Sequence, residues 1–331
     1  MKKLERICIV GAGAIGGFIG ARLAAVRSVP VAAIARGATL QALRDHGWRL
    51  QQDGALLQAP AIATDRAEDL GPQDLVVIAV KGPALASVAA SIAPLIGPDT
   101  VLLPAMNGVP WWFGQGVPAL GDTPLQSVDP DGRIARALPQ AQVLGCVVHA
   151  STAAQEPGLV VHHMGRGLIV GEPAGGDSPR VQAVVRLLAE AGFDTTVSAD
   201  IRYDIWYKLW GNMTANPVSA ITGATMDRLL DDPLVRDLCS AAMREAAAIG
   251  ARIGCPIAQT PEDRHAITRR LGAFRTSMLQ DADAGRPLEI DSLIGAVHEM
   301  GRRLGEPTPS IDAILGLARL FGRVRGLYPA A

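Results

Sequence analysis

Hydrophobic positions follow two different patterns along the 331-residue chain. In the first part, short runs of branched apolar residues alternate with longer segments of helical periodicity. Short and nearly continuous apolar runs are typical of strands that are buried on both faces of a parallel sheet. Five such runs occur: RICIVG at 6–11, VPVAAIAR at 29–36, DLVVIAVK at 74–81, DTVLLPAMN at 99–107 and VLGCVVHA at 143–150.

Helical spacers separate several of these runs, for example at 14–26 and 83–94. This alternation predicts βαβ units and a Rossmann-type, doubly wound parallel sheet. A further segment, GLVVHHMGRGLIVGE at 158–172, predicts two strands around a glycine-containing turn. In the last part of the chain, long helical patterns broken by Gly and Pro replace the apolar runs. We therefore predict an α/β domain over 1–199 and an all-α domain over 200–331.

Composition narrows the class of protein. Apolar residues make up 49% of the chain, and the formal net charge is −1. Such a chain can form a large core and is not intrinsically disordered, and it carries no basic excess for binding nucleic acid. The apolar amino-terminal stretch is interrupted by Glu5 and Arg6 and ends at Arg22, which does not fit a secretory signal. We expect a soluble, cytoplasmic protein with neither nucleic acid nor membrane as a partner.

Cysteines and histidines give no metal signature. The four cysteines (Cys8, Cys146, Cys239 and Cys255) are widely spaced, which is typical of small buried hydrophobic residues in a reducing compartment. His162 and His163 are adjacent on a predicted strand, so their side chains point to opposite faces of the sheet. We predict that the protein has no metal site.

A glycine-rich loop follows the first predicted strand. In ICIVGAGAIGGFIG, Gly11, Gly13 and Gly16 have G-x-G-x-x-G spacing between a strand and a helix. The first glycine permits a tight turn, the second lets a pyrophosphate approach the backbone, and the third allows close helix packing. The start of the helix then favours the phosphates. The loop predicted to bind a dinucleotide comprises Gly11, Ala12, Gly13, Ala14, Ile15 and Gly16.

The second predicted strand distinguishes between the two dinucleotides. An NAD site usually has an acidic residue there for the ribose 2′-hydroxyl, whereas an NADP site often has an arginine for the 2′-phosphate. This strand has no Asp or Glu and ends in AIARG. Arg36 therefore favours NADP(H), and the alternative is an arginine that is merely exposed at a strand end.

Two more strand ends carry polar residues, at the edge where such sheets bind ligands. Lys81 ends VVIAVK, and Asn107 follows TVLLPAM. The alternatives are a solvated charge for Lys81 and a turn residue for Asn107, which precedes a glycine.

In the helical part, a polar stripe interrupts an apolar pattern. In IWYKLWGNMTANPVSAITG at 205–223, Lys208, Asn212 and Asn216 recur every four residues and so lie along one side of a helix. Taken alone, Lys208 is a cation whose stem packs on apolar neighbours.

A second polar segment follows later in the same part. In TSMLQDADAGRPLEIDSLIGAV, Ser277 precedes a short helical pattern and Glu289 opens the next one. Favourable charge at a helix start is the alternative explanation of Glu289.

Together these segments resemble the ketopantoate reductase (2-dehydropantoate 2-reductase) family along nearly the whole chain. The matching motifs are GAGAIGG near the start, VK at 80–81, NG at 107–108, KLWGNMTANPVSAITG at 208–223 and SMLQDADAGRPLEID at 277–291. The last two are the most specific, because each fixes several polar residues at set spacing on helices.

The resemblance implies NADPH-dependent reduction of 2-dehydropantoate to D-pantoate, in pantothenate biosynthesis. The family's catalytic lysine and acidic residue fall on Lys208 and Glu289. Its other site positions fall on Asn107, Asn212, Asn216, Ser277 and Lys81, with Lys81 and Asn107 also facing the cofactor. The expected partner is a small-molecule 2-oxo acid, and a homodimer is an open alternative to a monomer.

Two departures leave the substrate open. Family members that reduce ketopantoate commonly have an asparagine three residues before the serine, where this chain has Phe274. The segment 108–140 is long for the family and contains Trp111 and Trp112, either as surface packing or as an apolar wall or lid over the substrate. The alternatives are a related reductase of a bulkier 2-oxo acid and a non-catalytic NADPH-binding sensor.

Overall fold

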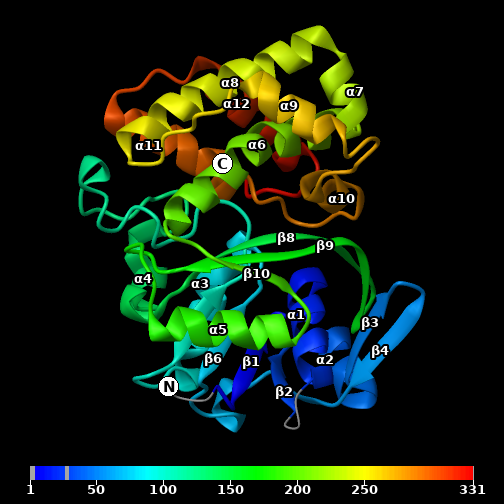
Figure 1. Cartoon of the computed structure of the whole chain (residues 1–331). Helices are drawn as coiled ribbons and strands as arrows, with labels where there is room; N and C mark the ends of the chain where they lie inside the picture. Colours follow the sequence, from blue (N-terminus) through cyan, green and yellow to red (C-terminus); the bar gives the residue numbers. More distant parts are fainter. Residues whose placement is uncertain (1–3, 27–29, 331) are drawn as a thin grey trace. The chain divides into compact units, whose positions relative to one another are not determined.

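The computed structural model of the chain describes residues 4–26 and 30–330 (Figure 1). Residues 1–3, 27–29 and 331, which the predicted domains include, lie outside the described residues. The chain forms two compact units: unit 1 is Met1–Met106 with Arg133–Asp204, and unit 2 is Asn107–Gly132 with Ile205–Ala331. The segment 107–132, which the sequence analysis places in the first domain, thus groups with the helices.

The first sheet of unit 1 has five parallel strands in the order β5-β2-β1-β6-β7. Their bounds are β1 Ile7–Val10, β2 Val31–Ile34, β5 Ala61–Thr64, β6 Leu75–Ile78 and β7 Val101–Pro104. Every residue of β1, β6 and β7 is buried, which explains their continuous apolar sequences. The predicted Rossmann-type fold is confirmed.

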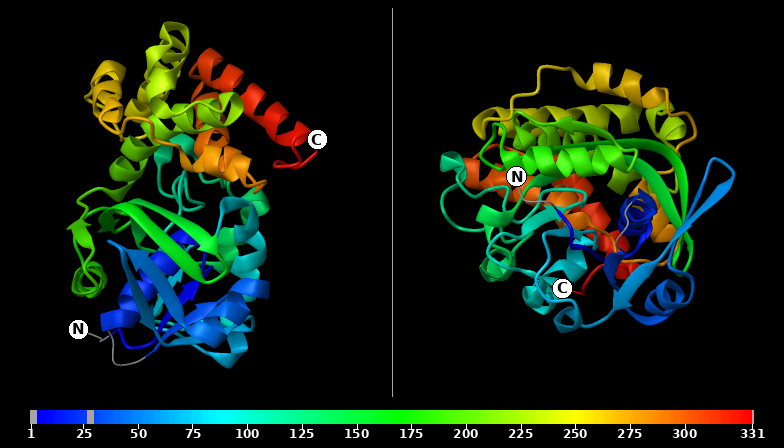
Figure 2. Two further views of the ribbon diagram at one scale, coloured as in Figure 1. Left: turned by 90° about the vertical axis from the view of Figure 1, so that its right-hand side faces the viewer. Right: turned by 60° about the horizontal axis from the view of Figure 1, so that its bottom comes forward.

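A second sheet in unit 1 has the order β10-β9-β3-β4, and β8 pairs with β9. The bounds of its strands are β3 Trp48–Gln52, β4 Ala55–Ala59, β8 Gly145–Glu156, β9 Leu159–Gly171 and β10 Asp194–Val197. The helix α1 (Ala14–Val26) contacts strands of both sheets and lies between them (Figure 2). The core of unit 1 therefore includes side chains from both sheets and from α1.

The structure corrects two strand predictions. The run 143–150 belongs mostly to β8, which pairs antiparallel with β9 in the second sheet. The segment 158–172 forms the single strand β9 rather than two strands. The chain turns before it, at Gly158 (φ +74°), while Gly165 (φ +74°) lies where the β8–β9 register shifts. Gly165 thus marks a bulge and not a hairpin turn.

Helices complete unit 1. Ser178 caps α5 by accepting the Val181 N–H, and Pro179 occupies its first turn, as in many helix starts. The other α-helices and short 3₁₀ turns connect strands of the first sheet or join it to the second. The bounds are α2 Gly37–His46, α3 Gly82–Ser91, α4 Arg133–Ala137, α5 Pro179–Glu190, η1 Ala67–Asp69, η2 Ala93–Leu95 and η5 Gln140–Gln142.

Unit 2 is helical, and three of its helices begin with side-chain caps from Asp232, Thr260 and Thr276. The bounds are η3 Pro118–Leu120, η4 Pro130–Gly132, α6 Ile201–Thr222, α7 Met226–Asp231, α8 Pro233–Arg252, α9 Pro261–Arg269, α10 Ser277–Asp283, η6 Asp291–Gly295, α11 Ala296–Leu304 and α12 Pro309–Val324. The first residues of α6 lie in unit 1, and the rest of the helix lies in unit 2.

The tryptophan pair is buried and does not lie at the surface. Trp111 and Trp112 are 1% and 0% exposed. The neighbouring Phe113 ring stacks on Trp206 of α6, with ring centroids 6.0 Å apart. These rings bury large apolar areas. This burial rules out surface packing of the pair, and the apolar wall over the substrate stays a prediction.

Two charged residues of α11 hold the rest of the segment 107–132. Arg303 donates to the carbonyl oxygens of Thr123 (2.7 Å) and Pro124 (2.5 Å). Glu299 accepts the N–H groups of Gln126 (2.9 Å) and Ser127 (2.8 Å). The segment is thus a bonded part of the helical unit, which argues against a lid.

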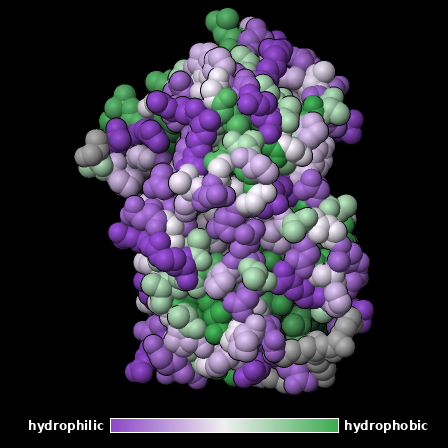
Figure 3. Space-filling view, turned by 90° about the vertical axis from the view of Figure 1, so that its left-hand side faces the viewer, coloured by the Kyte–Doolittle hydropathy of each residue, from purple (hydrophilic) through white to green (hydrophobic). Residues whose placement is uncertain are grey.

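The four cysteines are free and buried, as the sequence predicts. Burial raises the pKa of the Cys8 thiol to about 12 and that of Cys239 to about 11, so both are inert. Among residues 4–26 and 30–330, no helix has the length and apolar character needed to cross a membrane. The face of the protein in Figure 3 is mostly hydrophilic, with hydrophobic residues in small groups.

Candidate active site

The glycine-rich loop of unit 1 joins β1 to α1. Gly11 has φ +91°, and its N–H donates to the Ile34 carbonyl at 3.0 Å. A Cβ on Gly11 would lie 2.6 Å from Val80 Cγ1, and a Cβ on Gly16 would lie 1.9 Å from the Gly11 carbonyl oxygen. Both positions therefore need glycine for the fold itself.

Gly13 differs, because its missing side chain faces open space. An ideal Cβ at Gly13 would meet no atom of the described chain within 4 Å, and the residue is exposed. A hollow of about 150 Å³ lies here, lined by the glycine loop and by Arg36 and Thr39. The first turn of α1 contains Ala14 and Ile15 and presents the positive end of the helix dipole. These features fit the pyrophosphate of a dinucleotide.

Arg36 lies between β2 and α2. Its backbone is extended (φ −136°, ψ 160°), and its exposed side chain lines the same hollow. The residues that line this hollow, all within the described ranges, include no Asp or Glu. An anionic group on the ribose can therefore approach Arg36 without repulsion from a lining carboxylate.

Lys81 caps the start of α3, with φ −74° and ψ 150°. It follows β6, which pairs with β1, so it lies at the edge of the sheet that carries the glycine loop. The residue is half-buried, and its ammonium nitrogen is buried. Unit 1 thus brings Lys81, Arg36 and the loop to the carboxyl ends of adjacent parallel strands, where such sheets bind ligands.

In unit 2, the polar stripe lies along α6 as its spacing predicts. Lys208 Nζ donates to Asn107 Oδ1 at 2.7 Å. One end of the stripe is therefore joined to the segment 107–132. At the other end, the buried Asn216 directs Nδ2 to Ser277 Oγ at 3.4 Å. Asn212, between them, is half-buried.

The turn after Asn107 bonds to a distant helix of unit 2. Gly108 has φ +82°, and a Cβ there would lie 2.5 Å from the Ser292 carbonyl oxygen. The same carbonyl accepts the Val109 N–H at 2.8 Å. Glycine is required for this close approach, which fixes where Asn107 presents its amide.

That approach uses a π-helical turn at 291–295. The N–H of Ala296 bonds to the Asp291 carbonyl, five residues earlier, whereas in an α-helix it would bond to Ser292. The Ser292 carbonyl is therefore available to the turn beside Asn107. Glu289 lies two residues before the π turn, so one short stretch of chain carries Glu289 and positions Asn107.

The carboxyl-terminal tail forms hydrogen bonds with residues on both sides of Glu289 in the sequence. On one side, the Leu288 N–H donates to the Leu327 carbonyl at 2.9 Å. On the other, the Tyr328 hydroxyl donates to Asp291 Oδ1 at 2.7 Å. Burial, and then this bond to a carboxylate, raise the pKa of Tyr328, so its hydroxyl stays protonated. Glu289 is half-buried between these two attachments.

A hollow of about 100 Å³, the side pocket, adjoins the polar stripe within unit 2. Phe274 contributes its half-buried side chain to the lining. Apolar side chains and almost as many polar side chains surround it. The lining residues are Gly211, Asn212, Thr214, Ala215, Asn216, Met226, Leu229, Leu230, Cys239, Met243, Arg264, His265, Thr268, Leu271, Phe274 and Thr276.

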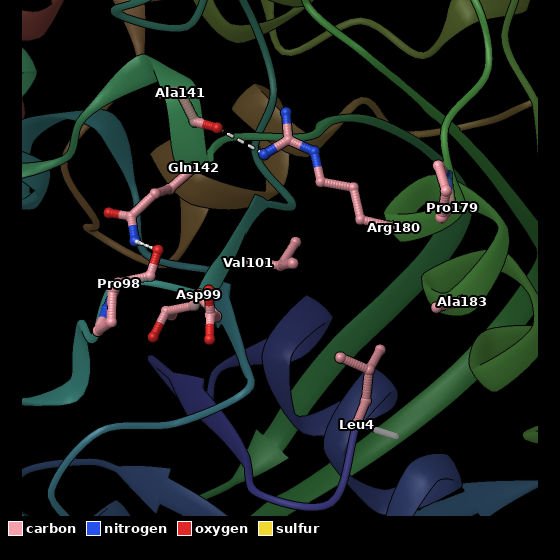
Figure 4. A pocket seen from close by; sticks show the side chains of 10 residues that line it. Leu4, Pro98, Asp99, Val101, Ala141, Gln142, Pro179, Arg180 and Ala183 are labelled. Atoms are coloured by element: carbon pink, nitrogen blue, oxygen red, sulfur yellow. Dashed lines mark hydrogen bonds between the residues drawn. The ribbon is translucent and has the colours of Figure 1, made fainter. Parts of the chain in front are cut away.

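A larger hollow of about 520 Å³ occurs in unit 1 but differs in kind (Figure 4). Arg180 donates there to the Ala141 carbonyl at 2.5 Å, and Gln142 donates to the Gly97 carbonyl at 2.6 Å. The hollow includes Val101, at the start of β7. It therefore lies at the amino ends of the strands, and its polar side chains bond to the chain itself.

Sequence reasoning missed the residues that hold the site together. Ser292 and Tyr328 act through a π turn and a tail contact, for which the sequence gives no periodic signal. Gly108 was readable as a turn glycine, but the helix that it approaches was not. Arg264, in the side pocket, lies on a polar helix without any motif.

Two family models match the chain. The model described as Ketopantoate reductase PanE/ApbA matches residues 7–175, and its C-terminal counterpart, Ketopantoate reductase PanE/ApbA C terminal, matches residues 200–321. Together they span both units. The last residues of the tail that brackets Glu289 follow the second match.

Individual relatives agree with this match. A protein of Mesorhizobium japonicum named 2-dehydropantoate 2-reductase is 42% identical, covering 98% of this chain and 99% of its own. The crystal structure of a candidate ketopantoate reductase from Ralstonia solanacearum MolK2 is 58% identical, with a TM-score of 0.95 over 98% of this chain and 100% of that one. A PanE/ApbA family ketopantoate reductase from Ralstonia eutropha JMP134 is 25% identical, with a TM-score of 0.83 over 97% and 100%. The chain therefore belongs to the ketopantoate reductase PanE/ApbA family and is a pyridine-nucleotide-dependent oxidoreductase.

Proposed function

We propose that the chain reduces 2-dehydropantoate (ketopantoate) to D-pantoate with NADPH, a step of pantothenate biosynthesis. The observation that carries the proposal is the Lys208 ammonium bonded to Asn107 Oδ1 at 2.7 Å, in a chain of this family. The name of the Mesorhizobium relative supports the choice of substrate. We also propose a cytoplasmic enzyme, and size-exclusion chromatography distinguishes a monomer from a homodimer.

Lys208 is the proposed proton donor. Reduction at C2 of a 2-oxo acid converts the ketone oxygen into a developing alkoxide, which needs positive charge and then a proton. A nicotinamide held by unit 1 would supply the hydride. The ammonium stabilises the alkoxide and transfers one proton to it, so a 2-hydroxy acid and the oxidised nucleotide result. Asn107 holds the ammonium in place through the bond to its amide oxygen.

Other side chains of unit 2 have supporting roles in this proposal. The amides of Asn212 and Asn216 bond to the substrate without adding charge, and the Ser277 hydroxyl bonds to its carboxylate. Glu289 supplies a negative charge that favours the protonated form of Lys208. A proton from solvent then converts the Lys208 amine back to the ammonium form, so that the enzyme can react again.

The cofactor is proposed to bind unit 1, with its 2′-phosphate on Arg36. The hollow beside Gly13 supports the place of the pyrophosphate, and the absence of Asp and Glu among the described lining residues supports NADPH over NADH. Lys81 and Asn107 are proposed to face the nicotinamide end. The proposed cofactor residues are Gly11, Ala12, Gly13, Ala14, Ile15, Gly16, Arg36, Lys81 and Asn107.

The test is steady-state oxidation of NADPH and NADH against a panel of 2-oxo acids. The proposal expects the highest kcat/KM for 2-dehydropantoate with NADPH. A different best substrate would contradict the substrate assignment but not the reaction type. NADPH binding without turnover of any panel member would favour the sensor hypothesis.

A second candidate is the reduction of a bulkier 2-oxo acid. It is favoured by Phe274, whose side chain lines the side pocket among other apolar side chains. A ring at this position cannot offer the hydrogen bonds of an amide. Branched and aromatic 2-oxo acids in the same panel distinguish the two candidates.

A further inference from the structure

Arg264 is the charged side chain of the side pocket. Among the described residues that line this hollow, it is the one Lys, Arg, Asp or Glu. The other titratable base there, His265, bonds through Nε2 to Ser240 Oγ at 2.9 Å, and burial lowers its pKa. At neutral pH the pocket therefore holds one cation among apolar and neutral polar side chains.

No carboxylate balances this cation within the chain. Across residues 4–26 and 30–330, Arg264 has no ion pair, and its Nε is buried without a hydrogen-bond partner. The same helix provides a contrast, because Arg269 bonds to Asp231 Oδ1 at 2.7 Å and to the Leu230 carbonyl at 2.8 Å. A partly buried cation without such partners is costly, and an acceptor from a ligand would reduce that cost.

Arg264 belongs to α9, and its side chain packs against α6 beside the polar stripe. Its guanidinium carbon lies 4.9 Å from the centroid of the Tyr207 ring. A Cβ on Gly211 would lie 3.0 Å from Arg264 Nε, so the glycine allows the guanidinium to lie against the helix. A glycine inside a helix is unfavourable by itself. Its presence here is explained by the place that it gives to Arg264.

We propose that Arg264 is a specificity residue, which binds an acceptor oxygen on the substrate side chain. The side pocket is lined by Asn212 and Asn216, which are proposed to bind the substrate, whereas Lys208, the proposed donor to the ketone oxygen, is not among its lining residues. The acceptor class includes a hydroxyl, as in 2-dehydropantoate, and a carboxylate, as in a 2-oxo dicarboxylic acid. This inference rests on the proposed function.

The experiment compares three substrates that share one skeleton. They are 2-dehydropantoate, its analogue 3,3-dimethyl-2-oxobutanoate without the hydroxyl, and dimethyloxaloacetate with a carboxylate in its place. We expect the wild-type kcat/KM to be roughly 10- to 100-fold higher for a substrate with an acceptor, since hydrogen bonds to charged groups have about this effect. Whichever of the two acceptor-bearing compounds has the larger increase in kcat/KM over 3,3-dimethyl-2-oxobutanoate identifies the preferred acceptor as a hydroxyl or a carboxylate.

In Arg264→Met, this preference should fall to within about threefold, because the substituted side chain keeps the length but not the donors. Arg264→Lys should restore part of the preference for the carboxylate. Arg269→Met is the matched control, because it removes an arginine of the same helix outside the pocket, and it should keep the wild-type ratio. An equal ratio in wild type and a folded Arg264→Met would overturn the inference.

Failure of the proposed function gives a different result from failure of this inference. If no 2-oxo acid is reduced, calorimetric binding of the three compounds, with oxidised cofactor present, gives the same comparison without turnover. Weaker binding of only the acceptor-bearing compounds to Arg264→Met would support the role of Arg264. Equal affinities in wild type and variant would overturn it.

Discussion

The two units carry candidate sites of different kinds. In unit 1, the hollow by the glycine loop lies beside Gly13, which has no side chain to fill it. In unit 2, the groups of the candidate site are side chains on helices, such as Lys208 and Asn216. A backbone site depends on local conformation, whereas a side-chain site depends on which helices pack together.

This difference decides how each site responds to substitution. A glycine can be needed for folding, for ligand approach or for both, and these two effects can be measured separately. A side chain in unit 2 can lose its chemistry while the helix that carries it remains folded.

The largest expected effect is in unit 2. Lys208→Ala should lower kcat by roughly 100-fold or more, as removal of a general acid commonly does, while cofactor binding stays nearly unchanged. Rapid-quench or steady-state kinetics measures kcat, and fluorescence titration measures the NADPH Kd. Lys208→Arg, which keeps the charge, is the matched control for electrostatics. A wild-type kcat in the alanine variant would remove Lys208 from the mechanism.

In unit 1, two glycines of the same loop should separate binding from folding. Gly13→Ala adds a Cβ in open space, so we expect an unchanged Tm but a cofactor Kd weaker by about 10-fold or more, because the proposed pyrophosphate site lies there. Gly16→Ala places its Cβ 1.9 Å from the Gly11 carbonyl oxygen and should lower the free energy of unfolding by about 2 kcal/mol or more. Thermal unfolding and NADPH titration of both variants test this. Similar behaviour of the two would contradict the distinction.

Arg36→Ala sharpens the assignment of the nucleotide. We expect the NADPH Kd to rise by roughly 10-fold, as when a charge-assisted bond is lost, and the NADH Kd to change much less. Arg44→Ala on α2, whose side chain bonds to the Ala63 carbonyl, is the matched control. Equal losses for both nucleotides would refute recognition of the 2′-phosphate by Arg36.

The smallest expected effect concerns Glu299, which holds the segment 107–132. Burial alone would raise its pKa, but bonds from Ser127, Gln126 and Arg303 together hold the pKa below the usual value. Its stabilisation is therefore present above the unfolded-state pKa of about 4.5 and is lost as pH falls through the lower folded-state pKa. We expect Glu299→Gln to lower the free energy of unfolding at pH 7 by about 1 kcal/mol, and by less at pH 3.

Urea unfolding at both pH values measures this difference. The control is Glu262→Gln, because Glu262 forms an exposed pair with Arg244 and should have little effect. An equal effect of Glu299→Gln at pH 7 and pH 3 would mean that the carboxylate charge contributes nothing.

The sequence predicted elements with local signals and missed those with distant causes. The parallel strands and the glycine loop were predicted because buried runs and glycine spacing are local patterns. The β3–β4 hairpin was missed although Asp53 and Gly54, both with positive φ, form a recognisable Asp-Gly turn. Its strands are half exposed, so they lack the continuous apolar runs on which the other strands were recognised.

In unit 2, the sequence predicted the polar stripe on one side of a helix but not the contacts that surround it. Helical spacing brings Lys208, Asn212 and Asn216 to one side of α6, which a sequence can reveal. The π turn that frees the Ser292 carbonyl depends on packing between segments far apart in the chain. The tryptophan pair was misplaced for the same reason, since nothing local distinguishes a buried loop from an exposed one.

Unit 2 is built from two segments that are separate in the sequence, and this has a consequence for how it folds during translation. The ribosome releases residues 107–132 well before α6, so the Phe113 ring leaves it without Trp206, on which it stacks. This ring must stay exposed, or be shielded by other means, until Trp206 has been synthesised. A fragment of the helices alone would likewise lack the buried side chains of Trp111, Trp112 and Phe113. Unit 2 can thus complete its core only after the strands of unit 1 have all been translated.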